Sequence, residues 1–525
     1  MRRTRMLTVM LMLAVAAMTT SAHIGSPDTW FRGEAGPYPV QVVVRLPGVV
    51  PGLGQIDITV EGDGVTKVTA QPVIYNAGPE GAPPADVATP VPGRPGTWHA
   101  ELWFMTPASF SVKVGVEGAR GAGMVAVPVA AVAEKQLAIY PWLGKLMLVL
   151  CALLVVGAIT IIRAAATDAV VPPGEVARPR LAGTVAPLAG AVLVAGLLFG
   201  GWQWWQSVAR EYADGLYRAT PMAARIDTVG GVRHLRLDVP MPTTDGPRSA
   251  SSRLVPDHGK LMHLFLMQQG VPEGSAAAFG HLHPVPTDSA TFSADLGTLP
   301  AGRYAVYADV VRETGFAPTM VATVEVPEGR VQINGSSSTQ QRVAGPAADP
   351  DDAVFIGTAA DAQFDLGDGA SVVWERGNAA VTAGDDARLR FVVRTADGTE
   401  MPLDPYLGMA GHAVVQRTDG GVYIHLHPNG TVSAGAQRAL AERQVTDSVP
   451  GMLAARLAGA NGMAGMPGMS HSAQPTFAGA LDFPYAFPTE GDYRVWVQFK
   501  AGGVVRTAAF RVRVGMPAEA AGRPT

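Results

Sequence analysis

Histidine residues recur in two similar arrangements in the C-terminal half of the chain. Each arrangement has one histidine followed, further along, by the element His-Leu-His-Pro. Because residues i and i+2 of a β-strand project from the same face, the two histidines of each element are expected to point the same way. The six residues of these two triads are His263, His281, His283, His412, His425 and His427.

Both triads have the composition of a metal site. The apolar run 261–267 predicts a strand that carries His263, and its pairing with the His-Leu-His strand would bring three imidazoles together. Three neutral imidazoles with an open fourth position suit Zn²⁺ or Cu²⁺. We therefore expect one divalent metal site in each copy; the alternative is a set of histidines that only hydrogen-bond within a β-sandwich. His258 and Met262 are additional donors that only the first copy carries.

A methionine-rich segment follows the second triad. Glycine and proline interrupt it, which excludes a regular apolar helix stripe. Thioether sulfur selects Cu(I) over the harder divalent ions, so the segment predicts copper binding. The alternative is a linker in which methionine is incidental. The donors are Met452, Met463, Met466, Met469 and His471.

The N-terminal residues 1–22 are typical of a secretory signal, with arginines before a short apolar run and small residues before Ala22. Cleavage there would make His23 the mature N-terminus; the alternative is an uncleaved anchor helix. The free amine and ring of His23, together with His99, could then form a histidine brace for copper. The alternative is that the N-terminal histidine is incidental.

Two apolar runs, 137–162 and 181–205, are each long enough to span a bilayer. The loop between them, 163–180, contains arginines, and the positive-inside rule places it in the cytoplasm. Residues 207–220 are expected to form a short helix leaving the membrane. The flanking domains would then lie in the periplasm, at the inner membrane.

We expect a mainly β fold: three Ig-like β-sandwich domains outside the membrane and a two-helix transmembrane hairpin. Short runs rich in β-branched residues, separated by glycine and proline, indicate the strands. Two of the regions share the order and spacing of their motifs and are predicted to be divergent copies. The expected parts are the N-terminal domain 23–133, the first copy 222–329, a linker 331–352 and the second copy 353–516, with an insertion at about 431–475.

At these motifs the sequence resembles known families. His263-Leu264-Phe265, the His-Leu-His-Pro elements and the run 300–304 resemble the YtkA-like and FixH-like β-sandwich domains of bacterial envelope proteins. The histidine-first N-terminal domain resembles the CopC-like copper-resistance group. Members of that group bind copper through an N-terminal histidine brace, and the resemblance implies His23 and His99 for that role.

The remaining composition excludes several functions. The formal net charge of −4 gives no basic domain for nucleic acid, and the single cysteine, Cys151, allows no internal disulfide. No hydrolase, phosphate-loop or dinucleotide motif is found, so we do not expect an enzyme. We expect a membrane-tethered periplasmic protein that binds copper, with zinc as the alternative metal, in tolerance, storage or delivery. Its partners would be the membrane and a periplasmic metal donor or acceptor protein. The alternatives are an envelope assembly or adaptor protein with structural histidines, and a histidine-brace copper oxygenase.

Overall fold

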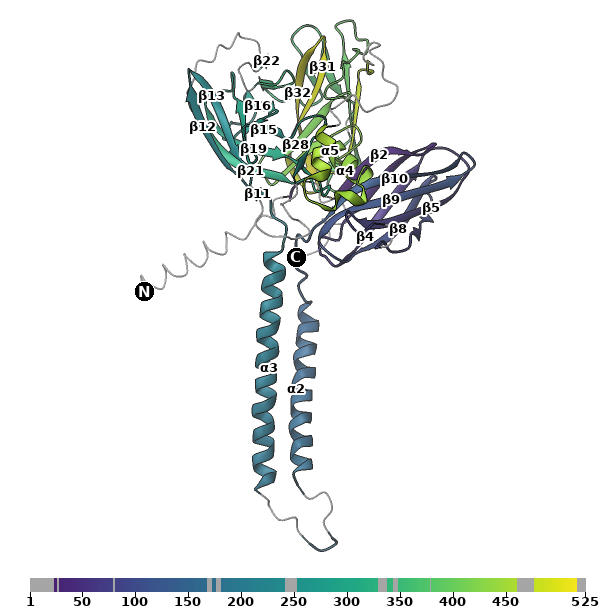
Figure 1. Cartoon of the computed structure of the whole chain (residues 1–525), viewed down its shortest axis with the longest axis vertical. Helices are drawn as coiled ribbons and strands as arrows, with labels where there is room; N and C mark the ends of the chain where they lie inside the picture. The colour runs from purple at the N-terminus through teal and green to yellow at the C-terminus, as the bar shows by residue number, and fades with distance from the viewer. Residues whose placement is uncertain are drawn as a thin grey trace. The chain divides into compact units, whose positions relative to one another are not determined.

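The computed structural model describes residues 23–25, 28–78, 81–167, 172–175, 181–240, 253–328, 338–342, 348–377, 379–459 and 476–516. The chain divides into two compact units (Figure 1). One unit comprises Val132–Arg218, and the other comprises Met1–Ala131 with Ala219–Thr525. Within the described residues, the first is helical and the second is mainly β.

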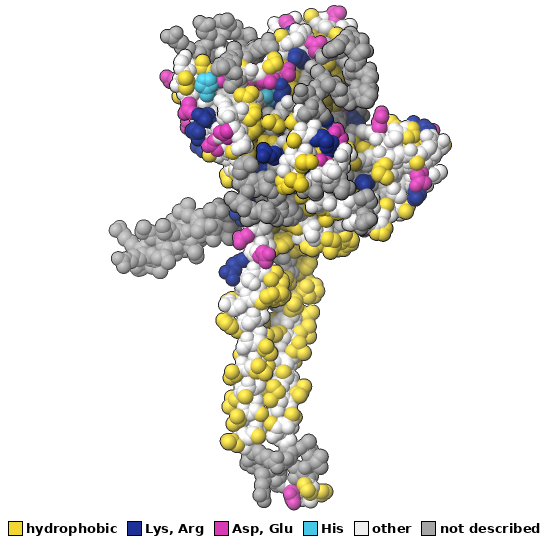
Figure 2. Space-filling model, viewed as in Figure 1, with side chains coloured by type: hydrophobic (Ala, Val, Ile, Leu, Met, Phe, Trp, Pro, Cys, Tyr) yellow, Lys and Arg dark blue, Asp and Glu magenta, His cyan; other side chains and the backbone are white. Residues whose placement is uncertain are grey.

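The helical unit contains α2 (Pro141–Ala165) and α3 (Ala182–Asp214), both long and apolar enough to cross a membrane. Most of their large apolar side chains are exposed, and Figure 2 shows them along the whole pair. The predicted apolar helices are therefore present. The short helix expected after the second run is instead continuous with α3, because no glycine or proline interrupts residues 203–214 and the helix ends at Gly215.

The N-terminal domain is a sandwich of two antiparallel sheets. Alternating apolar residues on the facing strands form one shared core, which includes Ile56, Leu102 and Val112. One sheet contains β2 (Asp28–Ala35), β3 (Tyr38–Arg45), β4 (Gly52–Val60), β8 (Thr97–Phe104) and β7 (Thr89–Pro90). The other contains β10 (Gly121–Ala131), β9 (Ala108–Gly118), β5 (Val65–Ile74) and β6 (Asp86–Val87).

The second sandwich follows the helical unit in sequence, and Leu235, Leu264 and Val306 belong to its core. Its larger sheet has the order β11 (Thr220–Pro221), β21 (Thr319–Val326), β19 (Gly302–Asp309), β15 (His263–Gln268), β16 (Ala277–Leu282), β23 (Ala353–Gly357), β22 (Ser338–Arg342). Its smaller sheet has the order β12 (Ala223–Val229), β13 (Val232–Asp238), β18 (Thr291–Asp295), β17 (Val285–Pro286).

The third sandwich is built in the same way, with Phe391, Phe483 and Phe510 in its core. Its larger sheet has the order β26 (Val381–Thr382), β32 (Val504–Gly515), β31 (Gly491–Ala501), β28 (His412–Arg417), β29 (Val422–Leu426), β1 (His23–Ile24). Its smaller sheet has the order β24 (Gln363–Asp365), β25 (Ser371–Trp374), β27 (Ala387–Arg394), β30 (Ala480–Tyr485).

The central strands of the second and third sandwiches have the same pairing. His263 lies opposite Asp309 in the second sandwich, and His412 lies opposite Gln498 in the third. In the same way, the strand of each leading histidine pairs antiparallel with the strand that begins its His-Leu-His element. The repeat predicted from the motifs is therefore present in the strand register. The Ig-like topology stays a prediction.

The larger sheets of these two sandwiches pack face to face. Tyr307 stacks on Tyr423 with ring centroids 4.1 Å apart, and Phe279 stacks on Trp496 at 4.9 Å. Tyr307 occupies the strand position of Trp496, and Phe279 that of Tyr423, so the two stacks are the same contact with the sandwiches exchanged. The interface therefore has approximate twofold symmetry.

Two features differ from the expected domain boundaries. Strand β22 lies within the expected linker 331–352, and β23, expected to begin the second copy, pairs with β16 in the sheet of the first. The exposed edge of β16 takes up this strand because its backbone groups need hydrogen-bond partners. The insertion contains helices α4 (Ala434–Ala441) and α5 (Met452–Gly459) and the 3-10 turn η1 (Val445–Ser448), and these helices pack on β14 (Leu254–Val255) and β20 (Val311–Arg312).

Candidate metal centre

The histidines of both triads lie in one buried cluster at the interface between the two larger sheets. The ring centroid of His425 is 5.4 Å from that of His263 and 5.3 Å from that of His412. All six triad histidines are buried. The sequence predicted one site in each sandwich, and face-to-face packing of the sheets instead brings both triads into one cluster.

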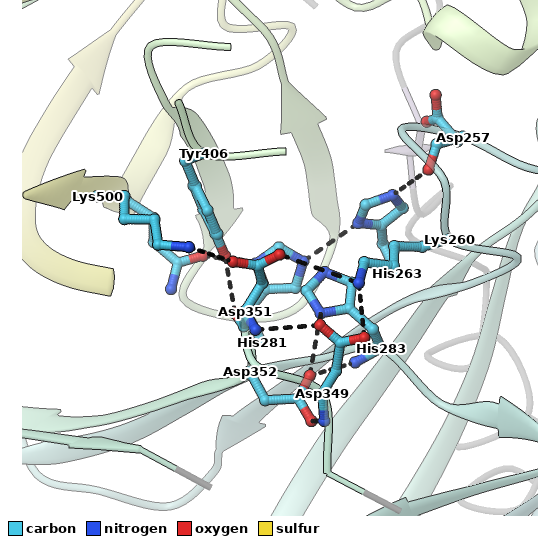
Figure 3. Close-up of polar contacts among 11 residues, drawn as sticks. Asp257, Lys260, His263, His281, His283, Asp349, Asp351, Asp352, Tyr406 and Lys500 are labelled. Carbon is cyan, nitrogen blue, oxygen red and sulfur yellow. Dashed lines mark hydrogen bonds and ion pairs between the residues drawn. The ribbon is translucent and has the colours of Figure 1, made fainter. Parts of the chain in front are cut away.

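The first group comprises His263, His281 and His283 (Figure 3). Strand β15 pairs with β16 as expected, and one ligand atom from each of the three rings lies within 4.8 Å of the others. The Nδ1 of His263 is 3.3 Å from the Nε2 of His281. Two imidazole nitrogens bound to one tetrahedral ion at about 2.0–2.1 Å would be separated by about 3.3 Å. This pair already has the spacing of ligands to a common ion.

The opposite nitrogen of each ring in this group contacts an oxygen atom. His263 Nε2 is 3.3 Å from the carbonyl oxygen of Asp257, and His281 Nδ1 is 2.7 Å from Gln498 Oε1. His283 Nδ1 is 3.0 Å from Asp352 Oδ1. Such contacts fix the tautomer and the orientation of metal-binding histidines.

The second group comprises His258, His412 and His427, with ligand atoms again within 4.8 Å of one another. His427 Nδ1 is 3.2 Å from the carbonyl oxygen of Val432, which leaves Nε2 for the cluster. His258 belongs to the second sandwich, whereas the other two histidines belong to the third. The sequence marked His258 as an additional donor of the first copy but did not predict that it would join the second triad.

Six ring nitrogens of the cluster are buried and have no hydrogen-bond partner within the described residues. They are both nitrogens of His412 and the Nε2 atoms of His258, His283, His425 and His427. Buried polar groups are normally hydrogen-bonded, since an unpaired one loses its contacts with water. Three of these unpaired nitrogens are on rings whose other nitrogen faces an oxygen atom, those of His283, His425 and His427. Such a concentration of unpaired imidazole nitrogens has the chemistry of a metal-binding pocket.

Burial keeps the histidines neutral. Desolvation lowers the pKa of His263 to about 4 and that of His427 to about 3. The same cause places the pKa values of His281, His283, His412 and His425 well below 6.5. A neutral imidazole retains the lone pair that a metal ion requires.

Carboxylates lie close to the Nδ1 atoms of two of these rings. Asp309 Oδ2 is 3.5 Å from His425 Nδ1, and desolvation raises the pKa of Asp309 to about 7. Desolvation likewise raises the pKa of Asp352, the partner of His283, to about 7. The sequence did not single out these acidic residues, because their positions depend on which strands lie beside the histidines.

A charged network borders the first group (Figure 3). Lys260 Nζ is 2.6 Å from Asp349 Oδ2, and Lys500 Nζ is 2.9 Å from Asp351 Oδ1. His283, Asp349 and Asp352 could also hold an ion, but Lys260 already supplies a positive charge to Asp349. We therefore assign the acidic residues to the surroundings of the cluster and the imidazoles to the ligands.

The remaining predicted site residues lie elsewhere or outside the described residues. His99 is on β8 of the N-terminal sandwich, with Nδ1 2.8 Å from Asp57 Oδ1. His23 is on β1, which pairs in parallel with β29 of the third sandwich, so the two brace residues belong to different sheets. The signal segment 1–22 and Met463, Met466, Met469 and His471 lie outside the described residues.

Comparisons with known proteins give little further identification. A domain of unknown function (DUF8832) matches residues 363–453 and 463–515, within the third sandwich. No curated protein matches the chain.

Among solved structures, the chain is similar to a tetra-tandem repeat of a large adhesion protein, at 9% identity and TM-score 0.14, covering 88% of this chain and 71% of that one. It is similar to Salmonella alpha-2-macroglobulin at 10% identity and TM-score 0.18, covering 94% of this chain but only 24% of the macroglobulin. A membrane-anchored protein of Corynebacterium diphtheriae matches at 9% identity and TM-score 0.15, with 94% and 96% of the two chains covered. Likenesses this weak carry no argument about function.

Proposed function

We propose that this chain is a membrane-tethered metal-binding protein that holds copper in the histidine cluster between its second and third sandwiches. Its role would be copper tolerance, storage or delivery. The observation that best supports this proposal is the group of six buried ring nitrogens without hydrogen-bond partners in the described part of the chain. In a protein whose histidines were only structural, these nitrogens would be expected to be paired.

Copper is favoured by the donor set. The cluster offers imidazole nitrogen, which suits copper as well as zinc, and Cu²⁺ is bound most strongly of the divalent first-row ions at a given site. The methionine-rich segment around Met463, Met466 and Met469 adds donors that select Cu(I). Zinc is the second metal to test.

The proposed location is the inner membrane, with both β-regions in the periplasm. The signal-like residues 1–22, the two apolar helices and the arginines of the loop 163–180 support it. Reporter fusions after residues 130 and 330 should report the periplasm, and a fusion at residue 172 the cytoplasm. A periplasmic result for the middle fusion would contradict this topology.

The metal proposal is tested on the full-length protein purified in detergent. Elemental analysis after equilibration with Cu²⁺ or Zn²⁺ should find bound metal, which the combined change of His281, His283, His425 and His427 to glutamine should greatly reduce. His234→Gln, on β13 and outside the cluster, is the matched control and should bind as wild type. Equal metal contents of wild type and the fourfold variant would favour the adaptor function.

A further inference from the structure

We propose that the cluster is a two-ion centre, in which the second ion is held jointly by both sandwiches. The proposal rests on the metal-binding function above and adds how many ions bind and which residues hold each. The two groups, one of His263, His281 and His283 and the other of His258, His412 and His427, share no residue. A single tetrahedral ion takes four ligands, so it cannot account for seven convergent histidines.

The second group takes its third ligand from the opposite sandwich. His258 lies in a turn closed by a bridge between Asp257 and Lys260. The third sandwich has the same turn, with Leu407 at the position of His258; both residues have positive φ, 50° and 53°. Only the second sandwich therefore has a histidine here, and its ligand atom lies with those of His412 and His427.

A contact from the third sandwich holds this turn. Asp257 Oδ1 accepts a hydrogen bond of 2.8 Å from the backbone N–H of Gly435 in α4. Residues other than glycine seldom have positive φ, so the conformation of His258 requires support from its surroundings. The side chain of Asp257 thus links the turn that carries His258 to the sandwich whose histidines it joins.

The two groups are adjacent rather than separate. The ring centroids of His263 and His412 are 6.4 Å apart, and those of His281 and His412 are 6.3 Å apart. His425 belongs to neither group, and its unpaired Nε2 lies in the same cluster. Its ring is 5.4 Å from that of His263 and 4.4 Å from that of His427, so it is within reach of both groups.

Carboxylates around the cluster can balance two cations. Buried cations need nearby negative charge, because burial removes their hydration. Asp352 Oδ1 is 3.0 Å from His283 Nδ1, beside the first group. Asp257 Oδ1 is 3.6 Å from His258 Nε2, beside the second group. The geometry therefore provides a carboxylate for each three-histidine group.

The test uses the full-length protein in detergent, with Cu²⁺ alone as the probe. His258→Leu introduces the residue that the third sandwich has at the same turn position, and His283→Gln removes a ligand of the first group. We expect each single variant to bind one ion fewer than wild type and the double variant to bind two fewer. His234→Gln is the control, and unfolding curves of the metal-free proteins check that the fold is retained.

Electron paramagnetic resonance gives a second measurement. Two neighbouring Cu²⁺ ions broaden each other's signal, so the intensity per bound copper should fall on full loading of wild type but not of His258→Leu. Should His258→Leu fail to fold, His427→Gln replaces it in both measurements.

Three results would overturn the proposal of two ions. They are a double variant that loses no more metal than either single variant, a His258→Leu protein that binds as wild type, and a signal per copper that does not change with loading. Loss of a single shared ion in all variants would leave the proposed function standing. Absence of metal from folded wild type would remove both proposals.

Discussion

The second and third sandwiches have the same strand register, but different residues contact the Nδ1 atoms of their equivalent histidines. His281 of the second sandwich faces the amide of Gln498, 2.7 Å away, from the third. Its counterpart His425 faces the carboxylate of Asp309, 3.5 Å away, from the second. Asp309 and Gln498 occupy the same strand position, and each has a threonine at the facing position of the next strand. The backbone of the repeat is retained, whereas the charge beside the histidines is not.

The turns before the leading histidines also differ, and again the second sandwich has the acidic residue. The second sandwich has Asp257 and His258 where the third has Tyr406 and Leu407. The second sandwich thus supplies the fourth histidine and the acidic residue, and the third supplies neutral side chains. His258 of this turn joins the histidines of the third sandwich, whereas Leu407 has no donor atom to offer in return.

The largest expected effect is that of pH on the metal-free protein. Unfolded histidines take up protons below about 6.5, whereas burial keeps His263 neutral down to about pH 4 and His427 to about pH 3. Stability should therefore fall as the pH is lowered from about 6.5 towards 4, by about 1.4 kcal/mol per pH unit for each net proton. Asp309 and Asp352, with pKa values raised to about 7, act in the opposite direction between about pH 7 and 4.

Six histidines with lowered pKa outnumber these two carboxylates, so acid should destabilise the metal-free protein. Urea unfolding in the presence of a chelator at pH 8, 6 and 5 measures this change in the free energy of unfolding. Stability that rises on acidification would show that the carboxylates dominate.

The leading histidines of the two triads should respond differently to removal. His412 has no hydrogen-bond partner among the described residues, so His412→Leu should leave the metal-free stability unchanged or higher. It should weaken binding at the second group by more than about 100-fold, because changing a residue that only hydrogen-bonds to a ligand already costs about 10–100-fold. His263→Leu should also lose metal, but it leaves His281 Nε2 and the carbonyl of Asp257 without their present partner.

His263→Leu is therefore expected to lower the free energy of unfolding, and His412→Leu is not. Calorimetric titration and chelator-treated unfolding measure the two effects. Equal destabilisation by both changes would mean that His412 has a structural role.

Exchanging the residues behind the central histidines should have a smaller effect. Asp309→Asn removes the carboxylate beside His425 and is expected to weaken metal binding by about 10–100-fold. Gln498→Glu places a carboxylate beside His281 and should strengthen binding at the first group. Competition titration with a chelator measures both. Unchanged affinity in Asp309→Asn would show that this carboxylate does not support metal binding through His425.

The smallest expected effect concerns the two aromatic stacks. Tyr307 accepts a hydrogen bond of 3.1 Å from Gln416 Nε2. In the equivalent stack of Phe279 and Trp496, the position of Tyr307 is taken by Trp496, which has no hydroxyl group. Tyr307→Phe should lower the free energy of unfolding by about 1 kcal/mol, because it leaves the buried amide unpaired. Phe279→Tyr introduces the residue that the third sandwich has at the same strand position, Tyr423. Metal content should stay at the wild-type value in both.

Several features of this protein could be predicted from the sequence because they depend on local periodicity. The alternation of strand residues places both histidines of each His-Leu-His element on one face, and apolar length alone identifies the helices α2 and α3. One further signal was available. Strand β15 is buried on both faces, as is β28, and such apolar runs indicate a sheet covered on both sides.

Only the tertiary structure decided which histidines meet. Strand periodicity fixes the face from which His281 projects, but not the sheet that covers that face. Packing of the two aromatic faces brought His425 beside His263 and placed Asp309 behind His425. The addition of His258 to the second group likewise depends on a turn of one sandwich reaching the other. These contacts join residues far apart in the chain, and the free energy that selects them comes from burial of a whole interface rather than from any local pattern.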